Sequence, residues 1–193
     1  MNIIQKYIPI NTERRPGIPI QKIKYIVAHD TGNLNSTALQ NVDFYIKTAN
    51  EVKASAHTFI DDKDIIECIP ETEKAYHVRR IVSNAIDEAL ALELCYFTDL
   101  ERSKLAYKNY VEYIKAWCLK YKLNPNTDIV GHYKLDPTRR TDPLNAFKLI
   151  GKTWEDFIKD LTPLPVNLKD VLLKRVQEIS TKVEELHKII KEL

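Results

Sequence analysis

Hydrophobic residues in the first half of the chain form short runs that predict β-strands. The segment KYIVAH (24–29) is apolar and rich in β-branched residues, and a polar, turn-forming segment follows it. HTFIDD (57–62) and DIIECIP (64–70) are strand-like runs on either side of a charged turn, which predicts a hairpin. In LALELCYF (90–97), leucines alternate with small residues and one carboxylate, so Glu93 is expected on the face of small residues.

Apolar residues at helical spacing predict helices elsewhere in the chain. From Thr37 to about Asn50 the pattern predicts an amphipathic helix, which begins with a capping box formed by Thr37 and Gln40. Residues 100–123 are predicted to form a long helix packed against the core, and residues 153–161 a short one.

The C-terminal segment carries a different pattern. After the proline-containing linker LTPLP (161–165), apolar residues alternate four and three apart over successive heptads, as in a coiled coil. Valine or isoleucine at every a position favours a parallel dimer, and a helix that folds back on its own domain is the alternative. We therefore predict a domain at 1–161, then a linker and heptad helix at 162–193 that could form a homodimer. The heptad residues are Leu172, Val176, Ile179, Val183, Leu186, Ile190 and Leu193.

Composition narrows the class of partner. Of the 193 residues, 29 are Lys or Arg and 27 are Asp or Glu, so the formal net charge is only +2. This balance gives no chain-wide electrostatic signal for nucleic acid or an anionic membrane, and we expect neither as a partner. The three cysteines lie far apart without a CxxC pair, which favours reduced core residues over disulfides or a zinc knuckle.

The N-terminal segment predicts where the protein is found. It lacks the apolar core and the small-residue cleavage site of a secretory signal. No later segment is long and apolar enough to span a bilayer. We therefore expect the newly made protein in the cytoplasm.

Two histidines follow strand-like runs: His29 ends KYIVAH, and His132 lies in DIVGHY (128–133). Side chains that follow neighbouring strands can meet at one edge of a sheet. A catalytic zinc takes three protein ligands and keeps one position open, and two histidines with one carboxylate form such a set. Asp142 would complete the set with His29 and His132. Ordinary surface chemistry is the alternative, because this spacing also occurs by chance.

Six blocks follow one another along residues 1 to 161: NIIQKYIP, KYIVAHDTGN, SAHTFIDD, AYHVR, LALELCY and GHYKLDPTRRTDP. In this order the chain resembles the type 2 N-acetylmuramoyl-L-alanine amidases, particularly phage and prophage endolysins, which share their fold with T7 lysozyme and the peptidoglycan-recognition proteins. The resemblance implies an α/β fold, with a central mixed β-sheet flanked by helices, to which the C-terminal amphipathic helix is added. It also implies a zinc enzyme that cleaves the bond between the muramic acid lactyl group and L-alanine in bacterial peptidoglycan.

The resemblance also implies roles for the metal-binding residues. His29, His132 and Asp142 match the family's three zinc ligands, the third of which is a cysteine in many phage relatives. A carboxylate donates less charge than a thiolate, so the zinc-bound water should be slightly more acidic. Asp136 is the reserve candidate for the third ligand.

Glu93 matches the family's catalytic glutamate. On the face of small residues, the Glu93 carboxylate would line a cleft and could act as general base. The alternative is that Glu93 is a solvated charge on an edge strand. Arg140 stands where relatives have a lysine that stabilises the oxyanion, and Arg139 could fill the same role. The tyrosine of T7-like members is replaced by Ala56, so Glu93 is expected to lack a tyrosine partner.

Four further residues are predicted to bind substrate: Asp30, Asn33, His57 and His77. The two histidines match the family's strand histidine and its AWHAG-like turn, and a hydrogen-bonded structural role is an equal alternative for each. The segment after Arg79 lacks the family's usual glycines, so the rim of the groove is expected to be helical and the specificity altered.

Three biological roles fit these features. An endolysin would wait in the host bacterial cytoplasm until it is released to the cell wall. A wall-recycling amidase would run the same reaction on soluble fragments. A recognition module that binds peptidoglycan without cutting it is the rival function, and it ranks lower because all three ligand positions are kept.

Overall fold

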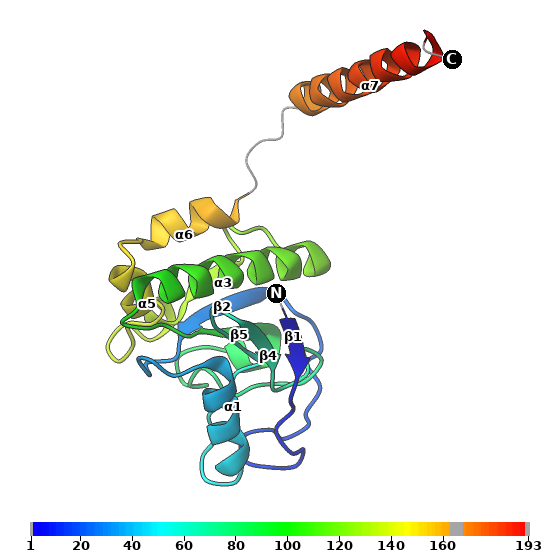
Figure 1. Cartoon of the computed structure of the whole chain (residues 1–193). Helices are drawn as coiled ribbons and strands as arrows, with labels where there is room; N and C mark the ends of the chain where they lie inside the picture. The colour runs from blue at the N-terminus through cyan, green and yellow to red at the C-terminus, as the bar shows by residue number, and fades with distance from the viewer. Residues whose placement is uncertain (1, 163–167, 192–193) are drawn as a thin grey trace. The chain divides into compact units, whose positions relative to one another are not determined.

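A mixed β-sheet of six strands lies at the centre of the first part of the chain (Figure 1). The computed structural model describes residues 2–162 and 168–191. Within them the strand order is β1-β4-β3-β5-β2-β6; β3 and β4 pair antiparallel as a hairpin, and every other neighbouring pair is parallel. This confirms the predicted α/β fold and the predicted hairpin. The strands are β1 (Asn2–Gln5), β2 (Tyr25–Asp30), β3 (Thr58–Ile60), β4 (Asp64–Glu67), β5 (Ala89–Leu94) and β6 (Ile129–Gly131).

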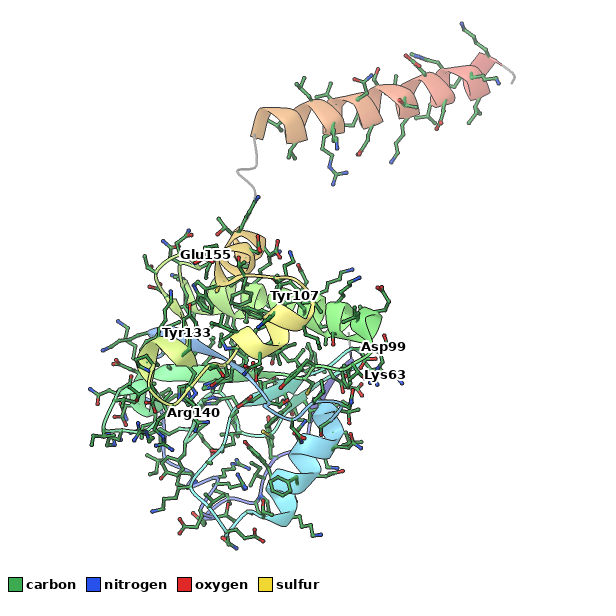
Figure 2. All side chains as sticks on the ribbon, turned by 90° about the vertical axis from the view of Figure 1, so that its left-hand side faces the viewer. Lys63, Asp99, Tyr107, Tyr133, Arg140 and Glu155 are labelled. Atoms are coloured by element: carbon green, nitrogen blue, oxygen red, sulfur yellow. The ribbon has the colours of Figure 1, made fainter. Side chains whose placement is uncertain are left out.

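Helices cover the sheet on both sides. In Figures 1 and 2, α3 and α6 lie on one side and α1 on the other. The long helix α3 packs against α5 and α6, whereas α1 contacts β3 and β4. The helices of this part are α1 (Ala38–Lys47), α2 (Ala85–Glu88), α3 (Leu100–Tyr121), α4 (His132–Leu135), α5 (Leu144–Leu149) and α6 (Trp154–Leu161).

The central strands are apolar because both faces of the sheet are covered. Ile26, Val27 and Ala28 of β2 are fully buried, and so are Leu90, Ala91 and Leu92 of the neighbouring strand β5. A parallel sheet between two layers of helices needs apolar residues on both faces, which explains the nearly continuous apolar runs.

The predicted capping box at the start of α1 is present. The Thr37 side chain accepts a hydrogen bond from the backbone N–H of Gln40, and the Gln40 side chain accepts one from the backbone N–H of Thr37. Two N–H groups that the helix leaves unpaired are therefore satisfied. The cap fixes where α1 begins over the sheet.

Some elements were not predicted. The edge strand β1 and the six-residue helix α5 are too short for a periodic pattern. The predicted strand DIVGHY ends at Gly131, and His132 begins α4. The expected helical segment after Arg79 is the short helix α2.

Residues 162–193 form a second unit, separate from residues 1–161. Its helix α7 (Leu168–Lys191) carries the predicted heptad pattern. The linker residues 163–167 and Leu193 lie outside the described residues. Among the described helices, none is both long and apolar enough to cross a membrane.

Candidate metal centre and catalytic cleft

The register of the sheet brings the predicted site residues together. In parallel strands β2 and β5, His29 is paired directly with Glu93, so both side chains leave the same face of the sheet. On the other side of β2, Ala28 is paired with Gly131 of β6. His132 follows Gly131 at the start of α4 and therefore lies beside His29.

His29, His132 and Asp142 form a compact buried cluster. The Asp142 Oδ2 atom lies 2.9 Å from His29 Nδ1 and 3.0 Å from His132 Nδ1. The two imidazole rings meet edge to face, with their centroids 4.7 Å apart. One donor atom from each residue thus points at a common centre.

The charge states of this cluster suit a metal ion. Burial lowers the pKa of His29, which favours the neutral ring. Burial raises the pKa of Asp142, but hydrogen bonds from His132 and His29 outweigh it and leave the pKa below its ordinary value. Metal ligands must be neutral imidazoles and ionised carboxylates.

The spacing of the three donor atoms also fits zinc. A tetrahedral zinc with bonds of about 2.0–2.2 Å to nitrogen and oxygen holds its ligand atoms roughly 3.3 Å apart. The two distances to Asp142 Oδ2 are close to that value. Two nitrogens and one oxygen leave one tetrahedral position open.

His29 is held from its other side by His77. His29 Nε2 lies 3.2 Å from His77 Nδ1, and His77 Nε2 is buried without a hydrogen-bond partner. If Nδ1 of His29 binds a metal, its Nε2 carries the proton and donates to His77. One ring nitrogen of His77 contacts His29 and the other is buried, so neither faces a substrate. The structure therefore favours a structural role for His77 over substrate binding.

Glu93 lies in the same cleft, with its Oε2 atom buried and without a hydrogen-bond partner. Burial raises the pKa of Glu93, and the negative charges of Asp142 and Asp30 add to the effect, while Arg140 opposes it. A carboxyl group with a raised pKa can exchange protons near neutral pH.

A tyrosine does line the cleft near Glu93, although the T7-like position is Ala56. Tyr45 comes from α1, and burial and the charge of Glu93 both raise the pKa of its hydroxyl. Its ring packs edge to face on Phe59, which is paired with Glu93 in the sheet. Sequence reasoning missed Tyr45 because it belongs to the apolar pattern of α1.

Arg139 and Arg140 both line the cleft, and their guanidinium groups have no carboxylate partner within the described parts of the chain. The charge of Arg140 lowers the pKa of both His29 and Glu93. Both arginines therefore stay candidates for the role of oxyanion stabiliser.

Asp136, the reserve ligand, has another partner. Its carboxylate accepts hydrogen bonds from Arg79 Nε at 2.9 Å and from Arg79 Nη2 at 2.8 Å. The Asp136 side chain is almost completely buried in this ion pair, which ties the segment of His77 to the end of α4. Asp136 stands outside the metal cluster, so the reserve assignment is wrong.

His57 is a structural residue. Its side chain is fully buried, its Nδ1 accepts a hydrogen bond from the backbone N–H of Ala91, and its Nε2 donates to the carbonyl of Glu73. Both ring nitrogens are therefore used within the fold. The prediction that His57 lines the substrate groove is corrected.

Asp30 and Asn33 have different outcomes. Asp30 lines the cleft and accepts hydrogen bonds from the backbone N–H groups of Gly32 and Ala146. Asn33 lies outside the cleft lining and donates a hydrogen bond to Asn41. Only Asp30 is placed where a substrate could touch it.

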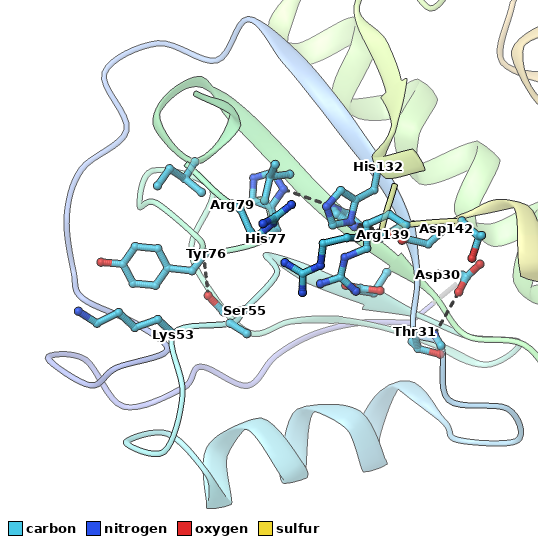
Figure 3. Close-up of a pocket in the computed structure, with 18 of the residues that line it drawn as sticks. Asp30, Thr31, Lys53, Ser55, Tyr76, His77, Arg79, His132, Arg139 and Asp142 are labelled. Carbon is cyan, nitrogen blue, oxygen red and sulfur yellow. Dashed lines mark hydrogen bonds and ion pairs between the residues drawn. The ribbon is translucent and has the colours of Figure 1, made fainter. Parts of the chain in front are cut away.

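The cleft around these residues has a volume of about 750 Å³. Figure 3 shows Asp30, His132 and Asp142 at one end, and Lys53, Ser55 and Tyr76 at the other. His77, Arg79 and Arg139 lie between the two ends. The cleft therefore extends from the cluster of His29, His132 and Asp142 toward Lys53, with room for a substrate along this length.

Comparisons with known proteins match the region that builds this cleft. Residues 19–145 match the family described as N-acetylmuramoyl-L-alanine amidase. The chain is 30% identical over 154 residues to the N-acetylmuramoyl-L-alanine amidase CwlL of Bacillus licheniformis, a match that covers 74% of this chain and 42% of CwlL. It is 33% identical over 149 residues to the N-acetylmuramoyl-L-alanine amidase BlyA of Bacillus subtilis, covering 67% of this chain and 39% of BlyA. The chain thus spans less than half of these curated relatives.

Solved structures share the fold. The catalytic domain of XlyA superposes with a TM-score of 0.71 at 22% identity, over 84% of this chain and 100% of that one. A mutant endolysin from Bacillus subtilis gives a TM-score of 0.72 at 24% identity, over 84% of this chain and 99% of that one. At these identities the likeness establishes the fold.

Proposed function

The chain belongs to the N-acetylmuramoyl-L-alanine amidase family, and from this premise we propose that it hydrolyses the amide between the lactyl group of N-acetylmuramic acid and L-alanine in bacterial peptidoglycan. The single observation that carries the proposal is the buried cluster of His29, His132 and Asp142 with Glu93 beside it in one cleft. Three metal-binding side chains and an adjacent carboxyl group are the parts that metal-assisted amide hydrolysis needs.

We propose zinc as the cofactor, held by His29 Nδ1, His132 Nδ1 and Asp142 Oδ2. Two histidines and one carboxylate are an established ligand set for catalytic zinc. When bound, zinc would polarise the scissile carbonyl and lower the pKa of a water molecule toward about 7. His77 would fix the ring of His29 from behind through its hydrogen bond.

Glu93 would act as general base and then as general acid. Its buried Oε2 has no competing hydrogen-bond partner, so it can accept a proton from the attacking water and pass it to the leaving amine. Arg140 would stabilise the negative charge that develops on the carbonyl oxygen. Its place in the cleft lining and its influence on the pKa of both Glu93 and His29 support this assignment.

The proposal predicts the behaviour of Glu93→Gln. This change removes the proton acceptor and leaves the three metal ligands intact, so turnover should fall by a factor of about 10² or more while zinc still binds in equimolar amount. Released peptides from purified cell walls would be measured by mass spectrometry, and zinc by atomic absorption. The variant Lys108→Gln, on the exposed face of α3, is the matched control. Unchanged turnover in Glu93→Gln would remove Glu93 from the mechanism.

We further propose that the enzyme is a phage endolysin, present in the host bacterial cytoplasm before it reaches the wall. One structure with the same fold is a Bacillus subtilis endolysin, which supports the proposal by analogy of fold. A wall-recycling amidase would instead prefer soluble muropeptides. Rates on intact walls and on soluble disaccharide peptides separate the two, because an endolysin should release stem peptides from intact walls efficiently.

A non-catalytic recognition module is the second candidate function. It would bind cell walls and release no peptide, with or without zinc. Stem peptides that begin at L-alanine, and that disappear when a chelator removes the metal, would exclude this candidate.

A further inference from the structure

Positive charge gathers around the cleft although the chain as a whole carries only +2. Two of the cations there are neutralised within the fold. Arg79 forms an ion pair with Asp136, and Arg80 forms one with Asp87. The five cationic residues of the lining are Lys53, Arg79, Arg80, Arg139 and Arg140.

Lys53 and Arg139 keep their charges available to a ligand. The Arg139 guanidinium has no ion pair within the described residues. Lys53 has only a loose partner, Glu13, at 3.6 Å, and both side chains are largely exposed. Such an exposed pair contributes little and can open at little cost. Arg140 is assigned to the reacting centre, so Lys53 and Arg139 are the cations left for substrate.

The segment that carries Lys53 is held in place by buried contacts. The buried guanidinium of Arg14 donates to the carbonyl of Ala54, and the backbone N–H of Arg14 donates to the carbonyl of Ala49. Ser55 and Tyr76 exchange two hydrogen bonds, one from each backbone N–H. Lys53 and Tyr76 therefore stand next to each other at one end of the cleft, on fixed backbone (Figure 3).

The two ends of the cleft differ in charge. At the metal end, the carboxylates of Asp30 and Asp142 would offset the charges of the proposed zinc and of Arg140, and Asn145 adds a neutral amide that donates to Asp30. From Arg139 to Lys53, the lining offers the Arg139 guanidinium, the loosely paired Lys53 ammonium and the Tyr76 phenol. A substrate with one neutral and one anionic part would bind in a single direction, with its anionic part toward Lys53.

The proposed substrate has such an asymmetry. On one side of the scissile amide lies a neutral glycan, and on the other a stem peptide with carboxylates. After L-alanine the stem continues with a glutamate residue linked through its side chain, whose α-carboxyl group is either free or amidated. We propose that the arm of the cleft from Arg139 to Lys53 binds the stem peptide and selects stems in which this carboxylate is free. The inference rests on the proposed function, because it takes the substrate from it.

The test compares two substrates that differ only in this group: a disaccharide-L-alanyl-D-glutamate with a free α-carboxylate, and the corresponding α-amide, the disaccharide-L-alanyl-D-isoglutamine. We expect the zinc-loaded 193-residue enzyme to cleave the acid with a kcat/KM roughly tenfold higher, mostly through KM, because a carboxylate makes stronger hydrogen bonds to cationic side chains than an amide does. Lys53→Gln and Arg139→Gln should each lower this ratio roughly threefold. Lys53→Arg, which keeps the charge, should preserve it.

Controls and contrary outcomes are well defined. Lys108→Gln removes an exposed lysine of α3 outside this cleft and should leave the ratio as in the parent enzyme. Raising the salt concentration should lower the ratio, because exposed charges are screened. Equal rates on the two substrates, or a preference that survives Lys53→Gln combined with Arg139→Gln, would overturn the inference and leave the amidase proposal standing. Failure to cleave either substrate or intact walls would overturn both.

Discussion

His29 shows how one side chain connects the metal cluster to the rest of the fold. Its Nδ1 faces Asp142, and its Nε2 faces His77. An imidazole that binds metal through one nitrogen carries its proton on the other. With zinc bound to Nδ1 as proposed, His29 would therefore donate a hydrogen bond to His77, which would fix the orientation of the ring. His132 has no such support, because its Nε2 is buried without a partner. The two candidate ligand histidines are thus held unequally.

This arrangement makes His77 a positioning residue, and the first residue-scale prediction follows from it. His77→Leu should weaken zinc binding by roughly 10–100-fold, as loss of an outer hydrogen bond to a metal ligand does. His77→Gln keeps an acceptor and should recover part of the affinity. Zinc dissociation constants would be measured by competition with a chromophoric chelator.

The spectrum of the cobalt-substituted protein gives a second readout, since it reports the geometry of the ligands. A merely structural role for His77 would lower thermal stability in both variants and leave zinc affinity and the cobalt spectrum unchanged. That result would contradict the prediction.

The second residue-scale prediction concerns His57 and pH. Burial lowers the pKa of His57 to about 4, below the value near 6.5 expected in the unfolded chain. Protonation therefore favours the unfolded state, so this stabilisation is present above about pH 6.5 and is lost as the pH falls toward 4. From pH 7.5 to pH 5.5 the loss of unfolding free energy should be about 1.4 kcal/mol.

Urea unfolding of the metal-free parent and of His57→Asn at the two pH values would measure this contribution as the difference between them, because burial also lowers the pKa of His29 and of His77. His57→Asn keeps an oxygen acceptor for the Ala91 N–H and cannot titrate, so its stability should fall less with pH. The same pH dependence in the variant and the parent would show that other groups cause it.

At the scale of the elements, long periodic segments were predicted well and short ones poorly. The pattern of 100–123 matches α3 (Leu100–Tyr121), because a helix that buries one face must repeat its apolar residues. The helix α4 has only four residues, too few to show a repeat of apolar positions. Strand β6 pairs with β2 as far as Gly131, and this pairing sets where β6 ends. A β-carbon on Gly131 would also lie 2.5 Å from the Tyr133 ring, so glycine permits close packing just before His132.

The element-scale prediction concerns α7, which we propose associates with α7 of a second copy. Taken by itself, α7 leaves the side chains of its described heptad residues largely exposed. The exposed fraction is lowest for Val183, at 45%, and highest for Ile190, at 65%. β-Branched residues at the a positions suit a two-stranded parallel coiled coil. The full-length protein should therefore be a dimer, and Val183→Glu, at an a position, should make it monomeric.

Sedimentation equilibrium would measure the molar mass of each form. Thr181→Glu places the same charge two residues away on the opposite face of α7 and should leave the dimer intact. A monomeric parent protein would favour the alternative in which the helix packs on its own domain. Deleting residues 166–193 would then leave the oligomeric state unchanged.

At the scale of the whole molecule, charge is distributed unevenly. The total of +2 gives no hint of an anionic ligand, yet the cleft holds five cationic side chains from separate segments. Arg79 and Arg80 form close ion pairs within the fold, and Lys53 has only a loose one with Glu13. Composition averages over the surface, whereas folding decides which charges become neighbours. The stem-peptide inference could therefore come only from the tertiary structure.

The sequence by itself determined the main elements and the candidate metal-binding residues, because periodicity and the family blocks are local features of the chain. His29, Glu93, His132 and Asp142 were all named from it, and the structure places them in one cleft. Tertiary structure alone decided the roles of residues whose partners are distant in sequence. Asp136 could not be told from a ligand until Arg79 was found beside it, 57 residues away. In the sequence, His57 and His77 are equivalent candidates. In the structure, His57 has two backbone hydrogen-bond partners, whereas His77 contacts His29. Hydrogen bonds and burial depend on which segments meet in space, and sequence spacing does not record that.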